Sequence, residues 1–184
     1  MPAAEPGRSV IVRRDNGHGA DVENKKSFRK GRVSRRETCT ELRPPIACAM
    51  SFTLHPRLEA GTFELGELLG CRVLLKNNTL FPWLLIVPEV EEGIEDLHQL
   101  DPNQFGDVAI AIRLVSQFVA DHFHPEKLNV ACIGNQVRQM HIHVVGRSTG
   151  DPAWPGVVWS FEGKKAYRTT EVETIRAAWE LHAG

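Results

Sequence analysis

The segment 139–145 constrains the fold most strongly, because its residues alternate strictly between two chemical types. It reads Gln-Met-His-Ile-His-Val-Val. Alternate side chains of a β-strand share one face of the sheet. The polar set is Gln139, His141 and His143, and the apolar set is Met140, Ile142 and Val144. The pattern therefore predicts a strand that carries polar chemistry on one face and packs its other face into a core.

The two histidines of this segment are the first candidates for chemistry. Same-face neighbours on a strand lie roughly 6.5–7 Å apart, close enough for both imidazoles to surround one phosphoryl group. Imidazole can act as nucleophile, acid or hydrogen-bond donor near neutral pH. Two other interpretations stay open, a structural pair and a zinc site with His122 or His124 as a further ligand. Nothing in the spacing places His122 or His124 beside the pair.

Short apolar runs around this segment predict further strands. The runs 71–75 and 83–87 are joined by the polar turn 76–79, a pattern that predicts an antiparallel hairpin. Residues 52–54 and 62–68 alternate well enough for short edge strands, and 128–133 form another apolar run. We expect an α+β fold with a mainly antiparallel five-stranded sheet.

One long helix should interrupt these strands. Asp101 is a suitable N-cap, Pro102 stands at the first helical position and Gln104 completes a capping box. The expected buried stripe follows at three- and four-residue intervals: Phe105, Val108, Ile112, Val115 and Val119. Pro125 should end this helix. A C-terminal helix is expected from about Thr170, with Val172, Ile175 and Trp179 on one face.

The charge distribution divides the chain into two parts. Residues 1–50 hold 11 Lys and Arg against 6 Asp and Glu, a net charge of +5. Residues 51–184 hold 11 against 17, a net charge of −6. We interpret residues 1–49 as a disordered basic tail. The tail has three other interpretations: a nucleic-acid contact, a transit peptide, or a segment that is not translated naturally because synthesis begins at Met50.

The cysteine pattern and the hydropathy of the chain indicate in which cellular compartment the protein is expected. Cys39, Cys48, Cys71 and Cys132 form no C-x-x-C pair and no secretory framework. No apolar run approaches the roughly 18 residues needed to span a bilayer. We therefore expect a cytoplasmic protein without membrane partners.

The segments 129–147 and 81–88 together resemble the histidine triad (HIT) family, whose signature is His-φ-His-φ-His-φ-φ with φ apolar. Residues 81–88 resemble the family's Pro-Gly-His-φ-φ-φ-φ-Pro strand. Gln139 replaces the first triad histidine and Trp83 replaces the upstream histidine. This Gln-x-His-x-His form and the run 151–159 resemble bacterial proteins similar to diadenosine tetraphosphate hydrolases. The resemblance implies a HIT domain over 50–160 and a C-terminal extension over 161–184.

The resemblance also assigns expected roles in the site. His141 matches the nucleophile that forms a nucleotidyl intermediate, and His143 matches the residue that hydrogen-bonds the phosphate and the leaving group. Gln139 would orient His141 through its amide. The expected nucleotide-binding residues are Asn77, Asn135, Gln136 and Trp83, although each Asn also suits an ordinary turn. Neither a metal nor a cofactor is needed for this chemistry.

Two functions follow from the resemblance and stay open. The first is a hydrolase or transferase that cleaves at the α-phosphate of dinucleoside polyphosphates or nucleoside phosphoramidates, which the intact pair His141 and His143 favours. The second is a nucleotide-binding regulatory module, which Gln139 and Trp83 favour. Trp154 and Trp159 are expected to line the leaving-group side, pack across a dimer interface, or lie buried for structural reasons. The family also implies a homodimer.

Overall fold

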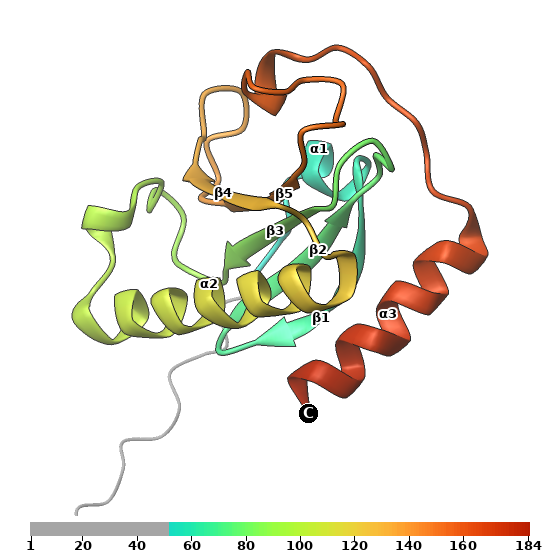
Figure 1. Cartoon of the computed structure of the whole chain (residues 1–184). Helices are drawn as coiled ribbons and strands as arrows, with labels where there is room; N and C mark the ends of the chain where they lie inside the picture. The colour runs from blue at the N-terminus through green and yellow to red at the C-terminus, as the bar shows by residue number, and fades with distance from the viewer. Residues whose placement is uncertain (1–51) are drawn as a thin grey trace, which may run out of the picture. The chain divides into compact units, whose positions relative to one another are not determined.

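A five-stranded antiparallel sheet forms the centre of the structure, a computed structural model that describes residues 52–184 (Figure 1). Its strand order is β1-β2-β3-β5-β4, so β1 and β4 are the edges. The elements are α1 (Pro56–Glu59), β1 (Thr62–Leu68), β2 (Cys71–Lys76), β3 (Trp83–Pro88), η1 (Leu97–Gln99), α2 (Pro102–Phe123), β4 (Lys127–Cys132), β5 (Ile142–Arg147), η2 (Val158–Ser160) and α3 (Thr169–Ala183). The predicted α+β class and the hairpin of β2 and β3 are confirmed.

The helix α2 begins as the sequence predicts. The Asp101 carboxylate accepts hydrogen bonds from the backbone N–H groups of Asn103 and Gln104, at 2.7 and 3.0 Å. The side-chain oxygen of Gln104 accepts from the Asp101 N–H at 3.1 Å, which completes the capping box. At its other end His124 adopts a left-handed conformation with φ of 50°, and Pro125 follows. Among residues 52–184, no helix is long and apolar enough to cross a membrane.

The core is divided between the two faces of the sheet. On one face the helices α2 and α3 lie against the sheet (Figure 1). Alternate residues of the strands are buried there, including Ile142 and Val144, and Met140 before β5 joins them, as expected. Trp179 of α3 is 1% exposed within this cluster. The second face carries a smaller cluster around Leu74, Phe81, Trp83 and Val145. The histidines therefore project from the face that the two long helices leave uncovered.

Three local expectations were wrong. Residues 52–54 are not a strand, because their backbone runs beside Gln139 and bonds its side chain instead of a neighbouring strand. Phe105 is half exposed at 50%, and Ala111 and Phe118 complete the buried stripe in its place. The last strand begins at Ile142, so residues 139–141 approach the sheet without being paired in it.

Candidate active site

His141 and His143 lie side by side at the start of β5. Their ring centroids are 4.8 Å apart with the planes at 73°, and their exposures are only 5% and 7%. His143 stands opposite Leu85 of β3 and Ala131 of β4, near the middle of the sheet. The predicted pair is thus brought together although His141 precedes the first paired residue of the strand.

A backbone carbonyl determines where His141 carries its proton. Nδ1 of His141 lies 2.8 Å from the carbonyl oxygen of Gln139. A carbonyl oxygen only accepts, so Nδ1 donates and Nε2 keeps its lone pair. Burial is the main cause that lowers the pKa of His141, with Lys76 and His55 acting in the same direction against the bond to Gln139. His141 is therefore a neutral imidazole with a nucleophilic Nε2.

Trp83 fixes the opposite arrangement on His143. Its indole Nε1–H donates to Nδ1 of His143 at 2.9 Å in a buried contact. Since indole nitrogen only donates, Nδ1 must be the acceptor and Nε2 must carry the proton. Burial is the main cause that lowers the pKa of His143, to about 3; the neighbouring imidazole of His141 acts in the same direction, and a backbone hydrogen bond to Ile133 opposes it. At neutral pH His143 presents an N–H donor and no positive charge.

A second tryptophan closes the same wall of the site. The ring of Trp159 lies 5.5 Å from His143 and 6.1 Å from Trp83, both edge-on. Its Nε1 is buried without a hydrogen-bond partner among the described residues. These contacts place Trp159 against His143 and Trp83, whereas Trp154 is 41% exposed. A role for either tryptophan at the leaving-group side or at a dimer interface stays a prediction.

A buried ion pair anchors the chain between β5 and this tryptophan. Arg147, 2% exposed, donates to both carboxylate oxygens of Asp151 at 2.7 and 3.0 Å, and to the side-chain oxygen of Asn129 at 3.1 Å. The hydrogen bond from Arg147 lowers the pKa of Asp151. This bidentate pair fixes the start of the segment that leads to Trp159. Sequence reasoning did not identify it.

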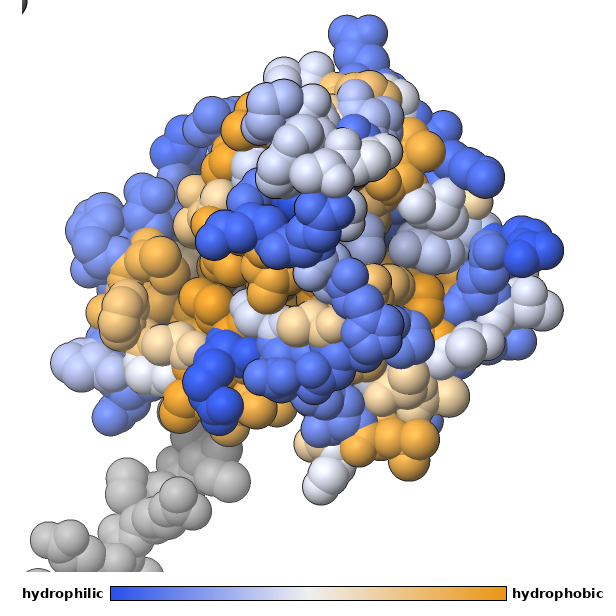
Figure 2. Space-filling model, viewed as in Figure 1, coloured by the Kyte–Doolittle hydropathy of each residue, from blue (hydrophilic) through white to orange (hydrophobic). Residues whose placement is uncertain are grey.

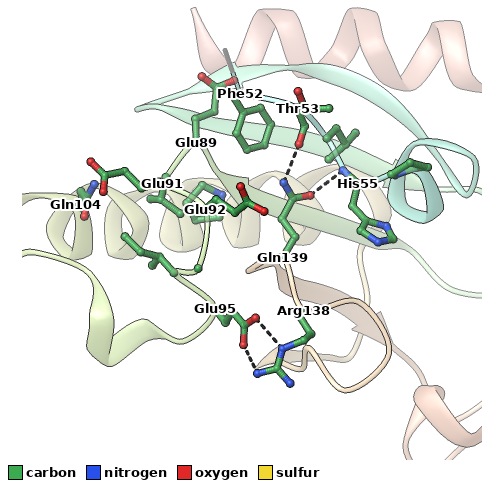
Figure 3. Close-up of a pocket in the computed structure, with 16 residues that line it drawn as sticks. Phe52, Thr53, His55, Glu89, Glu91, Glu92, Glu95, Gln104, Arg138 and Gln139 are labelled. Atoms are coloured by element: carbon green, nitrogen blue, oxygen red, sulfur yellow. Dashed lines mark hydrogen bonds and ion pairs between the residues drawn. The ribbon is translucent and has the colours of Figure 1, made fainter. Parts of the chain in front are cut away.

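The side chain of Gln139 does not orient His141 as expected. Its amide nitrogen donates to the carbonyl of Thr53 at 2.9 Å, and its oxygen accepts from the N–H of His55 at 2.8 Å (Figure 3). The contact with His141 comes from the Gln139 backbone carbonyl instead. Gln139 therefore ties the N-terminal segment 52–55 to the approach of β5, and thereby fixes the carbonyl on which His141 depends.

A pocket of about 820 Å³ has Gln139 in its wall. Gln139 and His55 line it, together with Glu89, Glu91, Glu92 and Glu95 from the segment after β3 (Figure 3). Neither His141 nor His143 is among its lining residues. Carboxylates repel phosphate, so this pocket does not suit the phosphate of a nucleotide.

The predicted nucleotide-binding amides lie in two different surroundings. Asn77 is engaged in the fold, because its side-chain oxygen accepts from the N–H of Tyr167 at 2.9 Å. Asn135 and Gln136 are exposed on the turn between β4 and β5. Arg57 of α1 donates to the Gln136 side chain at 3.1 Å and to its carbonyl at 3.3 Å. The turn is thus held against α1 by a cation.

The histidines considered as further metal ligands lie elsewhere. His124 caps the C-terminus of α2. His122 stacks on Phe118, whose side chain belongs to the core beneath the helices, with centroids 5.2 Å apart. His141 and His143 point from the other face of the sheet. His122 and His124 therefore do not supply the third ligand that the zinc interpretation needed.

Comparison with known proteins agrees with this geometry. The family model described as HIT domain matches residues 57–150. A histidine triad protein from Sinorhizobium meliloti 1021 is 34% identical with a TM-score of 0.69, over 72% of this chain and 97% of that one. The chain belongs to the HIT family. A histidine triad protein from Marinobacter aquaeolei VT8 is 36% identical with a TM-score of 0.68, over 72% and 96% of the two chains.

A more distant HIT structure shares the fold alone. A protein from Sulfolobus tokodaii strain7, described as a hypothetical histidine triad nucleotide-binding protein, is 18% identical with a TM-score of 0.51, over 66% of this chain and 83% of that one. No curated protein matches the sequence. The chain therefore belongs to a superfamily whose members are generally nucleotide-binding hydrolases or transferases.

Proposed function

We propose that this HIT protein cleaves at the α-phosphate of a nucleotide substrate through a covalent nucleotidyl-His141 intermediate. The observation that carries the proposal is the opposite placement of protons on two adjacent neutral imidazoles. Nδ1 of His141 donates to Gln139, and Nδ1 of His143 accepts from Trp83. One ring therefore offers a lone pair and its neighbour offers an N–H. The expected substrates are dinucleoside polyphosphates or nucleoside phosphoramidates.

In the first step Nε2 of His141 attacks the α-phosphorus. A P–N bond forms, the bond between phosphorus and the leaving group breaks, and the electron pair departs with the leaving group. The imidazole becomes positively charged as it bonds to phosphorus. The Gln139 carbonyl, which already accepts from Nδ1 at 2.8 Å, stabilises this charge.

In the second step water attacks the same phosphorus. A P–O bond forms, the P–N bond breaks, its electron pair returns to Nε2 of His141, and the water proton passes to solvent. Throughout, Nε2–H of His143 stabilises negative charge on the phosphoryl or leaving-group oxygen by hydrogen bonding. Donors of the turn that contains Asn135 and Gln136 would hold the remaining phosphate oxygens.

The alternative is a nucleotide-binding module without turnover. It is favoured by the low pKa of His143, about 3, because a neutral imidazole cannot protonate a basic leaving group at neutral pH. Turnover of any nucleotide substrate by the full chain would exclude this alternative. The two functions therefore differ in one observable, the release of the mononucleotide.

The test uses the full chain and a His141→Ala variant with diadenosine tetraphosphate and an adenosine phosphoramidate. We expect AMP release from the wild type and a loss of at least 1,000-fold in the variant, the scale on which a removed nucleophile reduces turnover. His98→Ala is the matched control, because His98 is exposed and far along the chain from the pair. Equal turnover by the His141 variant would exclude the covalent route, and mononucleotide binding without turnover would establish the module.

We also propose that the protein is a homodimer of the diadenosine tetraphosphate hydrolase-like HIT subfamily. Among the strands of residues 52–184, β4 is an edge strand that pairs with β5 alone, and its Val130 is 45% exposed. Apolar residues gather along the face where α2 lies (Figure 2), and Phe105 and Ile110 of that helix are 50% and 45% exposed. Light scattering should give a molar mass twice that of one chain. The Val130→Lys variant should give the mass of a single chain. A cytoplasmic location stays a prediction.

A further inference from the structure

Lys76 is a cation that the two-step mechanism does not use, although it faces the site. It is the last residue of β2, two residues beyond Leu74. Leu74 pairs with Leu85, which pairs with His143 on the other side. Since side chains two residues apart share a face, Lys76 projects from the same face of the sheet as His143.

The Lys76 ammonium group has no partner of opposite charge. Within residues 52–184 it makes no hydrogen bond or ion pair. Its Nζ lies over Gly61, 3.2 Å from the point that a Cβ would occupy there. Burial is the main cause that lowers the pKa of Lys76, and repulsion from Lys164 and Arg57 lowers it further. Two exposed cations, Lys164 and Arg57, therefore act on one half-buried ammonium group, which no carboxylate bonds within residues 52–184.

A cluster of like charges around a half-buried ammonium group lowers the stability of the fold unless an anion binds there. A half-buried charge loses hydration, and like charges nearby add repulsion. The three cations come from separate parts of the chain: Arg57 from α1, Lys76 from β2, and Lys164 from the segment before α3. Arg57 is in turn bonded to Gln136, on the turn expected to hold phosphate oxygens. Arg57 thereby connects the cluster with that turn.

We propose that Arg57, Lys76 and Lys164 bind the phosphate groups beyond the phosphorus that His141 attacks, so that the site selects substrates with a polyphosphate leaving group. The inference rests on the proposed function, because it takes the reacting phosphorus to lie at His141. It narrows the substrate class to dinucleoside polyphosphates and disfavours nucleoside phosphoramidates.

The chemistry of the leaving group supports the same choice. A polyphosphate departs as a stable anion and needs no proton, whereas an amine must be protonated as its bond to phosphorus breaks. His143 offers a hydrogen bond through Nε2–H, with Nδ1 already occupied by Trp83. Cations that neutralise a departing polyphosphate therefore complete this site, as they do in phosphoryl transfer generally.

The experiment compares two substrates in a variant that removes one charge while keeping most of the side-chain length, Lys76→Met. We expect kcat/KM for diadenosine tetraphosphate to fall at least 10-fold more than kcat/KM for an adenosine phosphoramidate. The matched control is Lys165→Met, which removes an exposed lysine next to Lys164 that does not perturb the pKa of Lys76. Equal losses on both substrates, or the same selective loss in the control, would overturn the inference.

A binding measurement keeps the inference separate from the proposed function. Inorganic tripolyphosphate, titrated calorimetrically into the full chain, should bind the wild type at least 10-fold more tightly than Lys76→Met. The variant should also melt at a higher temperature than the wild type without ligand, because repulsion within the cluster is relieved. If neither substrate turns over but this affinity difference holds, the proposed function fails and the phosphate site stands. Unchanged tripolyphosphate affinity would refute the site.

Discussion

The stability of the fold should depend on pH through His143. The imidazole of an unfolded chain takes up a proton near pH 6.5, whereas the pKa of folded His143 is about 3. Between these values the unfolded state binds more protons, so the free energy of unfolding must fall as the pH falls through this window. Each pH unit below 6.5 costs about 1.4 kcal/mol, which amounts to about 3 kcal/mol at pH 4.5. The lowered pKa of His141 acts in the same direction.

Urea unfolding of the wild type and a His143→Gln variant from pH 7 to pH 4.5 measures this effect. Glutamine cannot ionise, and its side-chain oxygen can still accept from Trp83. The stability of the wild type minus that of the variant should therefore decrease by about 3 kcal/mol over this range. His98→Gln, at an exposed histidine, is the control and should follow the wild type. A wild-type minus His143→Gln difference that stays constant with pH would refute the reasoning.

Three further substitutions test the contacts around the site. Urea unfolding measures the stability of each variant, and AMP release measures the turnover of the first. Trp83→Phe removes the donor to His143 and leaves a smaller ring, so it should cost about 3 kcal/mol and lower turnover at least 10-fold. Asp151→Asn leaves the buried Arg147 without its carboxylate and should cost about 3–5 kcal/mol. Gly146→Ala should cost about 1–3 kcal/mol, because its Cβ would lie 3.1 Å from a proline side chain on either side. Losses below about 0.5 kcal/mol would contradict each assignment.

Local patterns in the sequence were sufficient for most of the fold. The capping box at Asp101 and the apolar runs of β2 and β3 each depend on residues a few positions apart, so the sequence predicts them directly. The alternation around His141 and His143 likewise predicted which residues enter the core. The same alternation continued to Gln139, and for that reason the start of β5 was placed three residues too early.

The parts that sequence could not predict depend on contacts between distant residues. The side chain of Gln139 bonds Thr53, 86 residues away, and Trp83 bonds His143 across 60 residues. Asn77 is likewise engaged by Tyr167, 90 residues along the chain. No periodicity records such partners, because they arise only when the sheet brings its strands together. The alternation located the histidines and the resemblance assigned their roles, whereas the positions of their protons required the structure.

The proton positions on His141 and His143 are the most direct test of the account. A long-range nitrogen–proton correlation spectrum of the full chain with labelled histidines, recorded at pH 7, distinguishes the two neutral tautomers from the charged ring. His141→Gln and His143→Gln variants assign the two signals. The account predicts a proton on Nδ1 of His141 and on Nε2 of His143. The same tautomer on both rings, or a charged His143, would contradict it.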